Sequence, residues 1–218
     1  MPESQKHGLI LEDLIIQSHT NISKKEYDKK LENGYTSKFD LVEGIDVDYN
    51  MSIKTSAKKN IGCGDIRRFY EETKNTSFKM LIFSWTQISP LQKEFYQAHE
   101  FFIKPEYHEH FWGDITFQEL KEFDDYIKNI PHGKQGQKDN KDLWKEKRDV
   151  IKEKYPEAIM RIDAKVDSRT QRRTQCSFKI DKLKNIIPYE IYLHKYRDIS
   201  LPLIIDSPPR SRKKNVNS

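Results

Sequence analysis

The chain has few cysteines and no long apolar run. Its two cysteines, Cys63 and Cys176, have no C-x-x-C spacing, so neither a zinc motif nor a disulfide framework is indicated. The longest apolar runs, such as residues 80–83, are far too short to span a bilayer. Residues 1–17 also lack the basic and then apolar regions of a secretory signal. We therefore expect a cytoplasmic protein with no membrane partner.

Positive charge is concentrated in the last quarter of the chain. Residues 1–54 carry seven Lys/Arg and ten Asp/Glu, a net charge of −3, and residues 55–164 carry nineteen of each. Residues 165–218 carry thirteen Lys/Arg and five Asp/Glu, a net charge of +8. Such an excess favours a polyanionic partner, because each neutralised phosphate releases condensed counterions. The alternative is a solvated basic face with a disordered tail.

Two neighbouring segments each carry one residue suited to catalysis. Residues 39–43 and 51–56 read as strands, and the second runs Met-Ser-Ile-Lys-Thr from position 51. Side chains alternate along a strand, so Ser52 and Lys54 share one face. If the two strands pair antiparallel about Val47, Asp40 lies directly opposite Lys54. An acid, a lysine and a hydroxyl then converge.

A second pairing of the same segments remains open. A tighter turn centred on Tyr49 places Asp46 opposite Ser52, and strand parity does not choose between the two registers. We favour Asp40, because its neighbours Phe39 and Leu41 make a better strand than the glycine-containing residues 43–48. Asp46 is the alternative acid.

The acid and the lysine together suit phosphodiester hydrolysis, which needs hard oxygen ligands for a divalent cation and a group that orients water. With residues 61–68, which read Ile-Gly-Cys-Gly-Asp-Ile-Arg-Arg, these segments resemble the PD-(D/E)XK nuclease superfamily, in particular its type II restriction endonucleases. The resemblance covers residues 8–70. It departs from the family at Ser52, which occupies the carboxylate position of the (D/E)-x-K triplet.

The resemblance implies an α/β fold with a restriction-endonuclease-like core, in which helices flank a mixed central sheet. It implies a Mg²⁺ cofactor, no small-molecule cofactor, and double-stranded DNA as substrate. Asp40 would bind the metal and Lys54 would orient the water, while Ser52 would hold a metal-bound water or the lysine amine. A palindromic target would imply a homodimer. Two rivals are a repair or junction nuclease on the same core and a noncatalytic DNA-binding protein.

The missing carboxylate at position 52 must be replaced from elsewhere. In nucleases resembling this chain, an acid of the first helix often points into the metal site. Residues 8–17 read as a helix with Leu11, Leu14 and Ile15 on its apolar side. Glu12 lies in that helix and is the candidate second ligand.

Several basic and amide side chains are expected to contact DNA. Arg67 and Arg68 open a helix capped by Asp65, whose start could carry a phosphate. Residues 169–175 are rich in arginine and glutamine, which read guanine and adenine edges, although an ordinary exposed hairpin has the same composition. The expected DNA-contacting residues are Lys58, Arg67, Arg68, Lys165, Arg169, Gln171, Arg172 and Arg173.

The remaining sequence patterns predict the other helices, strands and loops and the domain organisation. We expect helices over 24–31, 66–73, 120–127 and 142–155, a buried strand over 79–88, and loops over 57–64 and 131–141. Ser23 and Glu26 form a plausible capping box for the first of these helices. The segment 90–102 is expected to turn Leu91, Phe95 and Phe102 inward. One nuclease domain is expected over 1–207, with its catalytic core at about 8–90, its recognition elements at about 99–185, and a disordered basic tail at 208–218.

Overall fold

The computed structural model describes residues 6–32, 37–167 and 171–206, and every structural statement below concerns these residues. The chain divides into two compact units. Unit 1 contains the described residues of 1–58, 78–101 and 189–218, and unit 2 contains those of 59–77 and 102–188. Both units combine helices with strands, and one sheet is mixed, so the expectation of an α/β fold with a mixed sheet is confirmed.

Unit 1 is built on a five-stranded mixed sheet with the strand order β1-β3-β4-β10, in which β7 also pairs with β4. Its elements are α1 (Lys6–Thr20), α2 (Lys24–Asp28), β1 (Met51–Ser56), β3 (Phe78–Ser89), β4 (Gln92–Ile103), β7 (Tyr189–Tyr192), β8 (Lys195–Tyr196), β9 (Ile199–Ser200) and β10 (Leu203–Asp206). Strand β1 is parallel to β3, with Lys54 opposite Ile82. Strands β7 and β10 are antiparallel to β4.

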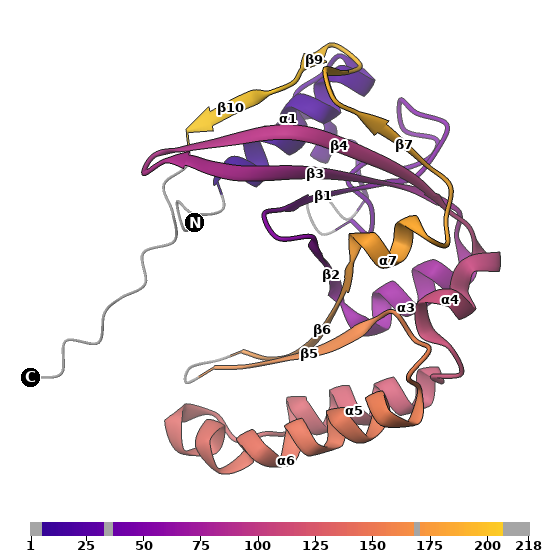
Figure 1. The fold of residues 1–218 in the computed structure, drawn as a ribbon, viewed down its shortest axis with the longest axis vertical. Coiled ribbons are helices and arrows are strands. Elements are labelled where there is room, and N and C mark those ends of the chain that lie inside the picture. Colours follow the sequence, from indigo (N-terminus) through magenta and orange to yellow (C-terminus); the bar gives the residue numbers. More distant parts are fainter. Residues whose placement is uncertain (1–5, 33–36, 168–170, 207–218) are drawn as a thin grey trace, which may run out of the picture. The chain divides into compact units, whose positions relative to one another are not determined.

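Helix α1 covers one face of this sheet (Figure 1). Its residues Leu11 and Ile15 are fully buried in a cluster that includes Leu81 and Phe83 of β3. All four residues of Met80–Phe83 are fully buried, which explains why β3 is a continuous apolar run with no alternation. The expected helix over 8–17 and the expected strand over 79–88 are both confirmed.

Unit 2 combines a three-stranded antiparallel sheet of order β2-β6-β5 with helices. Its elements are β2 (Asn60–Asp65), α3 (Ile66–Asn75), the 3₁₀ helix η3 (Pro105–Tyr107), α4 (His108–Trp112), α5 (Phe117–Lys128), α6 (Gly133–Lys154), β5 (Arg161–Val166), β6 (Arg172–Lys179) and α7 (Ile180–Lys184). Residues of β6 alternate between buried and more exposed, and Thr174, Cys176 and Phe178 are buried. Helix α5 packs beside β6, with α6 next to it (Figure 1).

The local capping signals are confirmed. Ser23 and Glu26 form a capping box at the start of α2, although this helix ends at Asp28 instead of residue 31. The Asp65 carboxylate accepts a hydrogen bond from the Arg68 backbone N–H and begins α3.

Between residues 57 and 141, the expectations for three segments are wrong. The expected loop over 57–64 contains β2, because pairing with β6 satisfies the backbone of a glycine-containing segment that has little strand propensity of its own. The expected loop over 131–141 belongs mostly to α6, which begins at Gly133 with a φ of 92°. The segment 90–102 is mainly β4, so Phe95 is buried as expected but Leu91 and Phe102 are 62% and 46% exposed.

Of the helices that the structure describes, none combines the length and the apolar character needed to cross a membrane.

A polar cluster in unit 1 joins α1 to Tyr49, to Tyr196 of β8 and to Glu100 of β4. The Nδ1 atom of His19 lies 2.5 Å from the Tyr49 hydroxyl, and its Nε2 atom lies 3.1 Å from the Tyr196 hydroxyl. The Tyr196 hydroxyl donates to Glu100 at 2.9 Å, so it can accept from Nε2–H while Tyr49 donates to Nδ1. A neutral His19 imidazole can therefore form hydrogen bonds with both tyrosine hydroxyls.

We expect stability to fall in mild acid because of His19. Burial, followed by the charges of Arg197 and Lys79, lowers its pKa from 6.5 to about 4. A lowered histidine pKa means that the unfolded chain binds the proton first, so stability is full above pH 6.5 and is lost as the pH falls toward 4. Allowing for partial exposure, the loss is about 1–2 kcal/mol. Urea unfolding at pH 7 and pH 5 measures it.

The matched variants are His19→Gln, which cannot titrate, and His110→Gln, which removes an exposed histidine of α4. The first should flatten the pH dependence and the second should leave it unchanged. An unchanged pH dependence in His19→Gln would assign the acid sensitivity to another group.

Candidate functional site

The Asp40 carboxylate is anchored to the middle of the lysine-bearing strand. Its Oδ2 atom accepts a hydrogen bond of 2.6 Å from the backbone N–H of Ile53, the residue between Ser52 and Lys54. The segment that carries Asp40 is held by backbone bonds between Leu41 and Met51. The structure therefore places the predicted acid directly against the predicted Ser-Ile-Lys triplet.

The register of this pairing differs from the one expected. The only bridge described between the two segments joins Leu41 to Met51, which centres the turn on Asp46 and not on Val47 or Tyr49. Residues 39–43 form no strand beyond this bridge. The turn takes left-handed conformations at Gly44, with φ of 84°, and at Asp46, with φ of 59°, which shortens it. Asp40 reaches the triplet through its side chain, not through a position opposite Lys54.

Glu12 of α1 contacts Asp40, an arrangement that the family resemblance implies for an acid of the first helix. Burial is the main cause that raises the pKa of Glu12 to about 7, and the charge of Asp40 and a hydrogen bond between the two carboxyl groups act in the same direction. Because burial and a neighbouring carboxyl group both disfavour its ionised form, Glu12 is kept near its ionisation point at neutral pH. The fully buried Leu11 fixes the helix face on which Glu12 lies.

Lys24 is a residue of this site that the sequence did not reveal. Its Nζ atom lies 2.9 Å from Glu12 and 3.0 Å from Asp28, and the ion pair with Glu12 opposes the rise in the pKa of that carboxyl group. The Lys24 backbone N–H also donates to Asp13 at 2.6 Å, which joins the start of α2 to α1. The capping box at Ser23 predicts that Lys24 begins a helix, but it does not predict the contact between Lys24 and Glu12.

Lys54 and Glu12 line the same pocket of unit 1. The pocket has a volume of about 330 Å³ and is lined by His7, Gly8, Leu9, Glu12, Ile53, Lys54 and Thr55. Lys54 is half-buried, and no described residue forms an ion pair or a hydrogen bond with its ammonium group. A lysine held in a pocket without a partner is available to a ligand or a substrate.

His7, which lines this pocket, belongs to a buried pair with Lys93 that the sequence did not reveal. Lys93 of β4 is only 3% exposed, and its Nζ atom lies 2.9 Å from Nδ1 of His7 and 4.4 Å from the centre of the Trp85 ring. Burial lowers the pKa of Lys93. The hydrogen bond and the cation–π contact hold His7 at the edge of the pocket.

Ser52 and Asp46 lie in different surroundings from Glu12 and Asp40. Ser52 is 7% exposed. A water or a Lys54 amine that Ser52 holds, as predicted, would therefore lie below the protein surface. Asp46 lies in the turn and forms an ion pair of 2.6 Å with Lys30. The structure therefore gives no support to Asp46 as the alternative metal ligand.

The pair of Glu12 and Asp40 fits a divalent cation. A cation between them would relieve the repulsion and the burial that raise the Glu12 pKa. Mg²⁺ is commonly held by one or two carboxylates and keeps several waters. Within the part of the chain that the structure describes, no group of three or more His, Cys, Asp or Glu side chains is placed to hold a metal.

Three of the arginines expected to contact DNA are engaged within unit 2. Arg67 lies 3.6 Å from Asp124, and Arg68 lies 3.4 Å from Glu72. Arg172 is 8% exposed, and its guanidinium donates to the backbone oxygens of Ile130, Pro131, Asp167 and Gln171. Its position gives no support to the base-reading role expected for it.

The other expected DNA contacts are on the surface. Lys58, Lys165, Gln171 and Arg173 are exposed, and Lys165 is paired with Arg173 across the β5–β6 hairpin. Arg169 lies outside the described residues. The hairpin therefore presents two adjacent cations and an amide on one polar edge.

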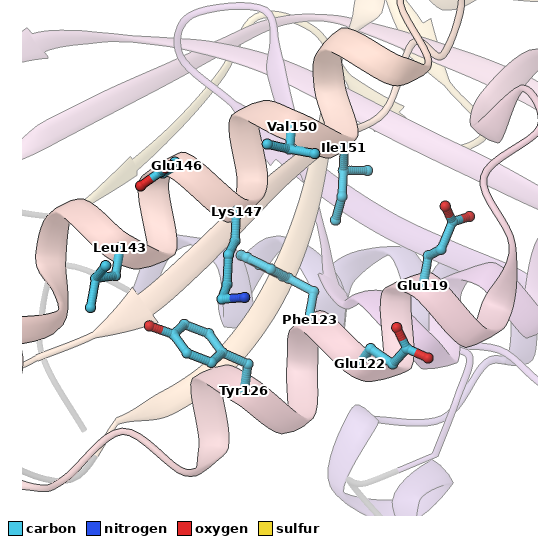
Figure 2. Close-up of a pocket in the computed structure, with 9 residues that line it drawn as sticks. All are labelled: Glu119, Glu122, Phe123, Tyr126, Leu143, Glu146, Lys147, Val150 and Ile151. Atoms are coloured by element: carbon cyan, nitrogen blue, oxygen red, sulfur yellow. The ribbon is translucent and has the colours of Figure 1, made fainter.

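A different pocket lies between α5 and α6 and has a volume of about 510 Å³ (Figure 2). Leu143 and Val150 of α6 are more than half exposed beside it, at 52% and 59%. Burial would raise the pKa of Glu119, but hydrogen bonds from Lys154, Thr116 and Tyr155 lower it to about 2. Glu119 is therefore held as an ionised structural acid, and Glu122, Glu146 and Lys147 line the same pocket.

Comparison of the chain with models of protein families, with curated proteins and with solved structures finds no match.

We expect Arg172 to stabilise unit 2. Arg172→Gln removes a buried guanidinium and leaves several carbonyl oxygens without their donor, so the free energy of unfolding should fall by about 2–4 kcal/mol. Arg173→Gln, one position away and exposed, should change it by less than about 0.5 kcal/mol. Urea unfolding followed by tryptophan fluorescence measures both. Equal stability of the two variants would show that the Arg172 bonds contribute nothing to the fold.

Proposed function

We propose that this chain is a Mg²⁺-dependent nuclease that cleaves double-stranded DNA at specific sites, on a restriction-endonuclease-like core. The observation that carries the proposal is the contact between the Glu12 and Asp40 carboxyl groups, with Lys54 and Glu12 lining one pocket. Acids and a lysine brought together from α1, the 39–43 segment and β1 match the chemistry that the PD-(D/E)XK resemblance implies. The DNA substrate and its sequence-specific cleavage rest on that resemblance.

Each residue of the proposed site has a distinct task. Glu12 and Asp40 would hold Mg²⁺, which supplies positive charge at the scissile phosphate when bound. The Ile53 N–H fixes one oxygen of Asp40, and Lys24 fixes one oxygen of Glu12, so both carboxylates are oriented before substrate binds. Lys54 would orient the attacking water and stabilise the negative charge that develops on the phosphorane.

Fewer residues are available to contact DNA than the sequence suggested. Arg67, Arg68 and Arg172 are engaged by acids or carbonyls. The described candidates that remain for base or phosphate contacts are Lys58 and, on the β5–β6 hairpin, Lys165, Gln171 and Arg173. If the target is palindromic, a homodimer would match its two-fold symmetry. A restriction enzyme of this kind would act in the cytoplasm.

The deciding experiment is incubation of the purified protein with long duplex DNA and Mg²⁺. Discrete bands are expected, and EDTA should abolish them. Nicks confined to branched or flapped substrates would favour a repair or junction nuclease, since such enzymes read DNA shape. DNA binding without any cleavage would favour a noncatalytic binding protein.

Alanine variants test the site residue by residue. Asp40→Ala, Glu12→Ala and Lys54→Ala should each reduce the cleavage rate by at least about 100-fold, because each removes a ligand or the group that acts on the water. DNA binding measured in Ca²⁺ should survive the Lys54 change within several-fold, because Lys54 acts on the reaction and does not anchor the DNA.

Matched controls are Asp46→Ala, which removes an acid of the same region paired with Lys30, and Lys25→Ala, which removes an exposed lysine of α2. Both should cleave within about three-fold of the parent. An inactive Asp46→Ala beside an active Asp40→Ala would transfer the metal-binding role to Asp46. Equal loss of binding and cleavage in Lys54→Ala would make Lys54 a phosphate anchor.

A further inference from the structure

We propose that a pocket of unit 2, separate from the residues of the proposed nuclease site, binds a nucleotide. The pocket has a volume of about 730 Å³ and lies between the second half of α6, the segment 155–160 and strand β5, with Lys179 of β6 at its rim. Ligand sites usually have volumes of about 300–1,000 Å³, so a single nucleotide fits inside. The proposal does not depend on nuclease activity.

The floor of this pocket is apolar. Four of its lining residues are buried, namely Ile115, Tyr155, Met160 and Ile162, and Ile151 adds a half-buried aliphatic side chain. A flat aromatic ring placed on these side chains would remove apolar surface from water. A nucleobase is such a ring.

The rim of the pocket supplies cations without partners. Lys152, Arg161 and Lys179 are exposed, and none of them forms an ion pair or a hydrogen bond with a described residue. Arg148, the remaining cation, is held by Asp149 at 2.7 Å. Three free cations around one pocket offer charge-assisted hydrogen bonds to a phosphate group.

The same rim carries acids that narrow the class of ligand. Glu153 has no partner among the described residues, and Asp163 accepts a hydrogen bond of 2.6 Å from Ser177. Carboxylates accept hydrogen bonds from the exocyclic amino groups of bases, as in contacts to N4 of cytosine. Phosphate-binding cations, an apolar floor and a free carboxylate together fit a nucleotide whose base bears an amino group.

Calorimetric titration of the full chain in EDTA tests this proposal. We expect dCMP or dGMP to bind with one saturable site, with a dissociation constant on the order of tens of micromolar, and dTMP, which lacks an exocyclic amine, to bind at least about five-fold more weakly. Inorganic phosphate alone should bind far more weakly than either, because it cannot cover the apolar floor.

Variants locate the site. The double variant Arg161→Ala and Lys179→Ala should weaken dCMP binding at least ten-fold, whereas Lys141→Ala, an exposed lysine of α6 outside the pocket, should not. Glu153→Gln should reduce the preference for dCMP over dTMP while leaving dTMP affinity unchanged. Far-UV circular dichroism checks that each variant is folded.

Three outcomes would overturn the proposal, and a competition experiment identifies the source of the ligand. Absence of saturable binding, equal affinity for inorganic phosphate, or binding that survives the double variant would each overturn the proposal. Competition with a short cytosine-rich single strand identifies the source of the ligand. Displacement of dCMP by the strand supports a unit of a polynucleotide, and failure to displace it supports a free nucleotide.

Discussion

The hydrogen bond from the Ile53 backbone N–H to the Asp40 carboxylate, 2.6 Å long, joins the only two chain segments that the motif requires to meet. Strand β1 is placed by its parallel pairing with β3, and the acid-bearing segment is placed by its bridge to Met51. Neither pairing alone brings an acid to the Ser-Ile-Lys triplet. The side-chain bond does so, and the Asp40 carboxyl group also contacts that of Glu12.

A second constraint follows from burying charge. Glu12 is kept near its ionisation point by burial and by Asp40, with Lys24 as counter-charge. Arg172, also buried, is stabilised by backbone oxygens instead of an acid. Buried charges need such partners because desolvation is costly. Lys54 is the contrasting case, since it is half-buried and no described residue pairs with it. That contrast distinguishes a group held for structure from one available to a substrate.

Local signals in the sequence were sufficient for features that depend on neighbouring residues. The capping box of Ser23 and Glu26, the cap at Asp65 and the apolar run of β3 each involve residues within a few positions of one another. Features that depend on distant partners were missed or misplaced. Strand β2 exists because β6 pairs with it, and the register of Leu41 with Met51 depends on a turn with two left-handed residues.

The sequence by itself determined that an acid and a lysine stand on adjacent segments, and that Glu12 lies on a helix with an apolar face. Periodicity and spacing carry this information because side chains repeat every two residues on a strand and about every 3.6 on a helix. Only the tertiary structure decided that Glu12 touches Asp40, that Lys24 and the buried Lys93 flank the site, and that Arg172 bonds carbonyls. Those outcomes depend on burial and on contacts between distant residues, and local sequence patterns specify neither.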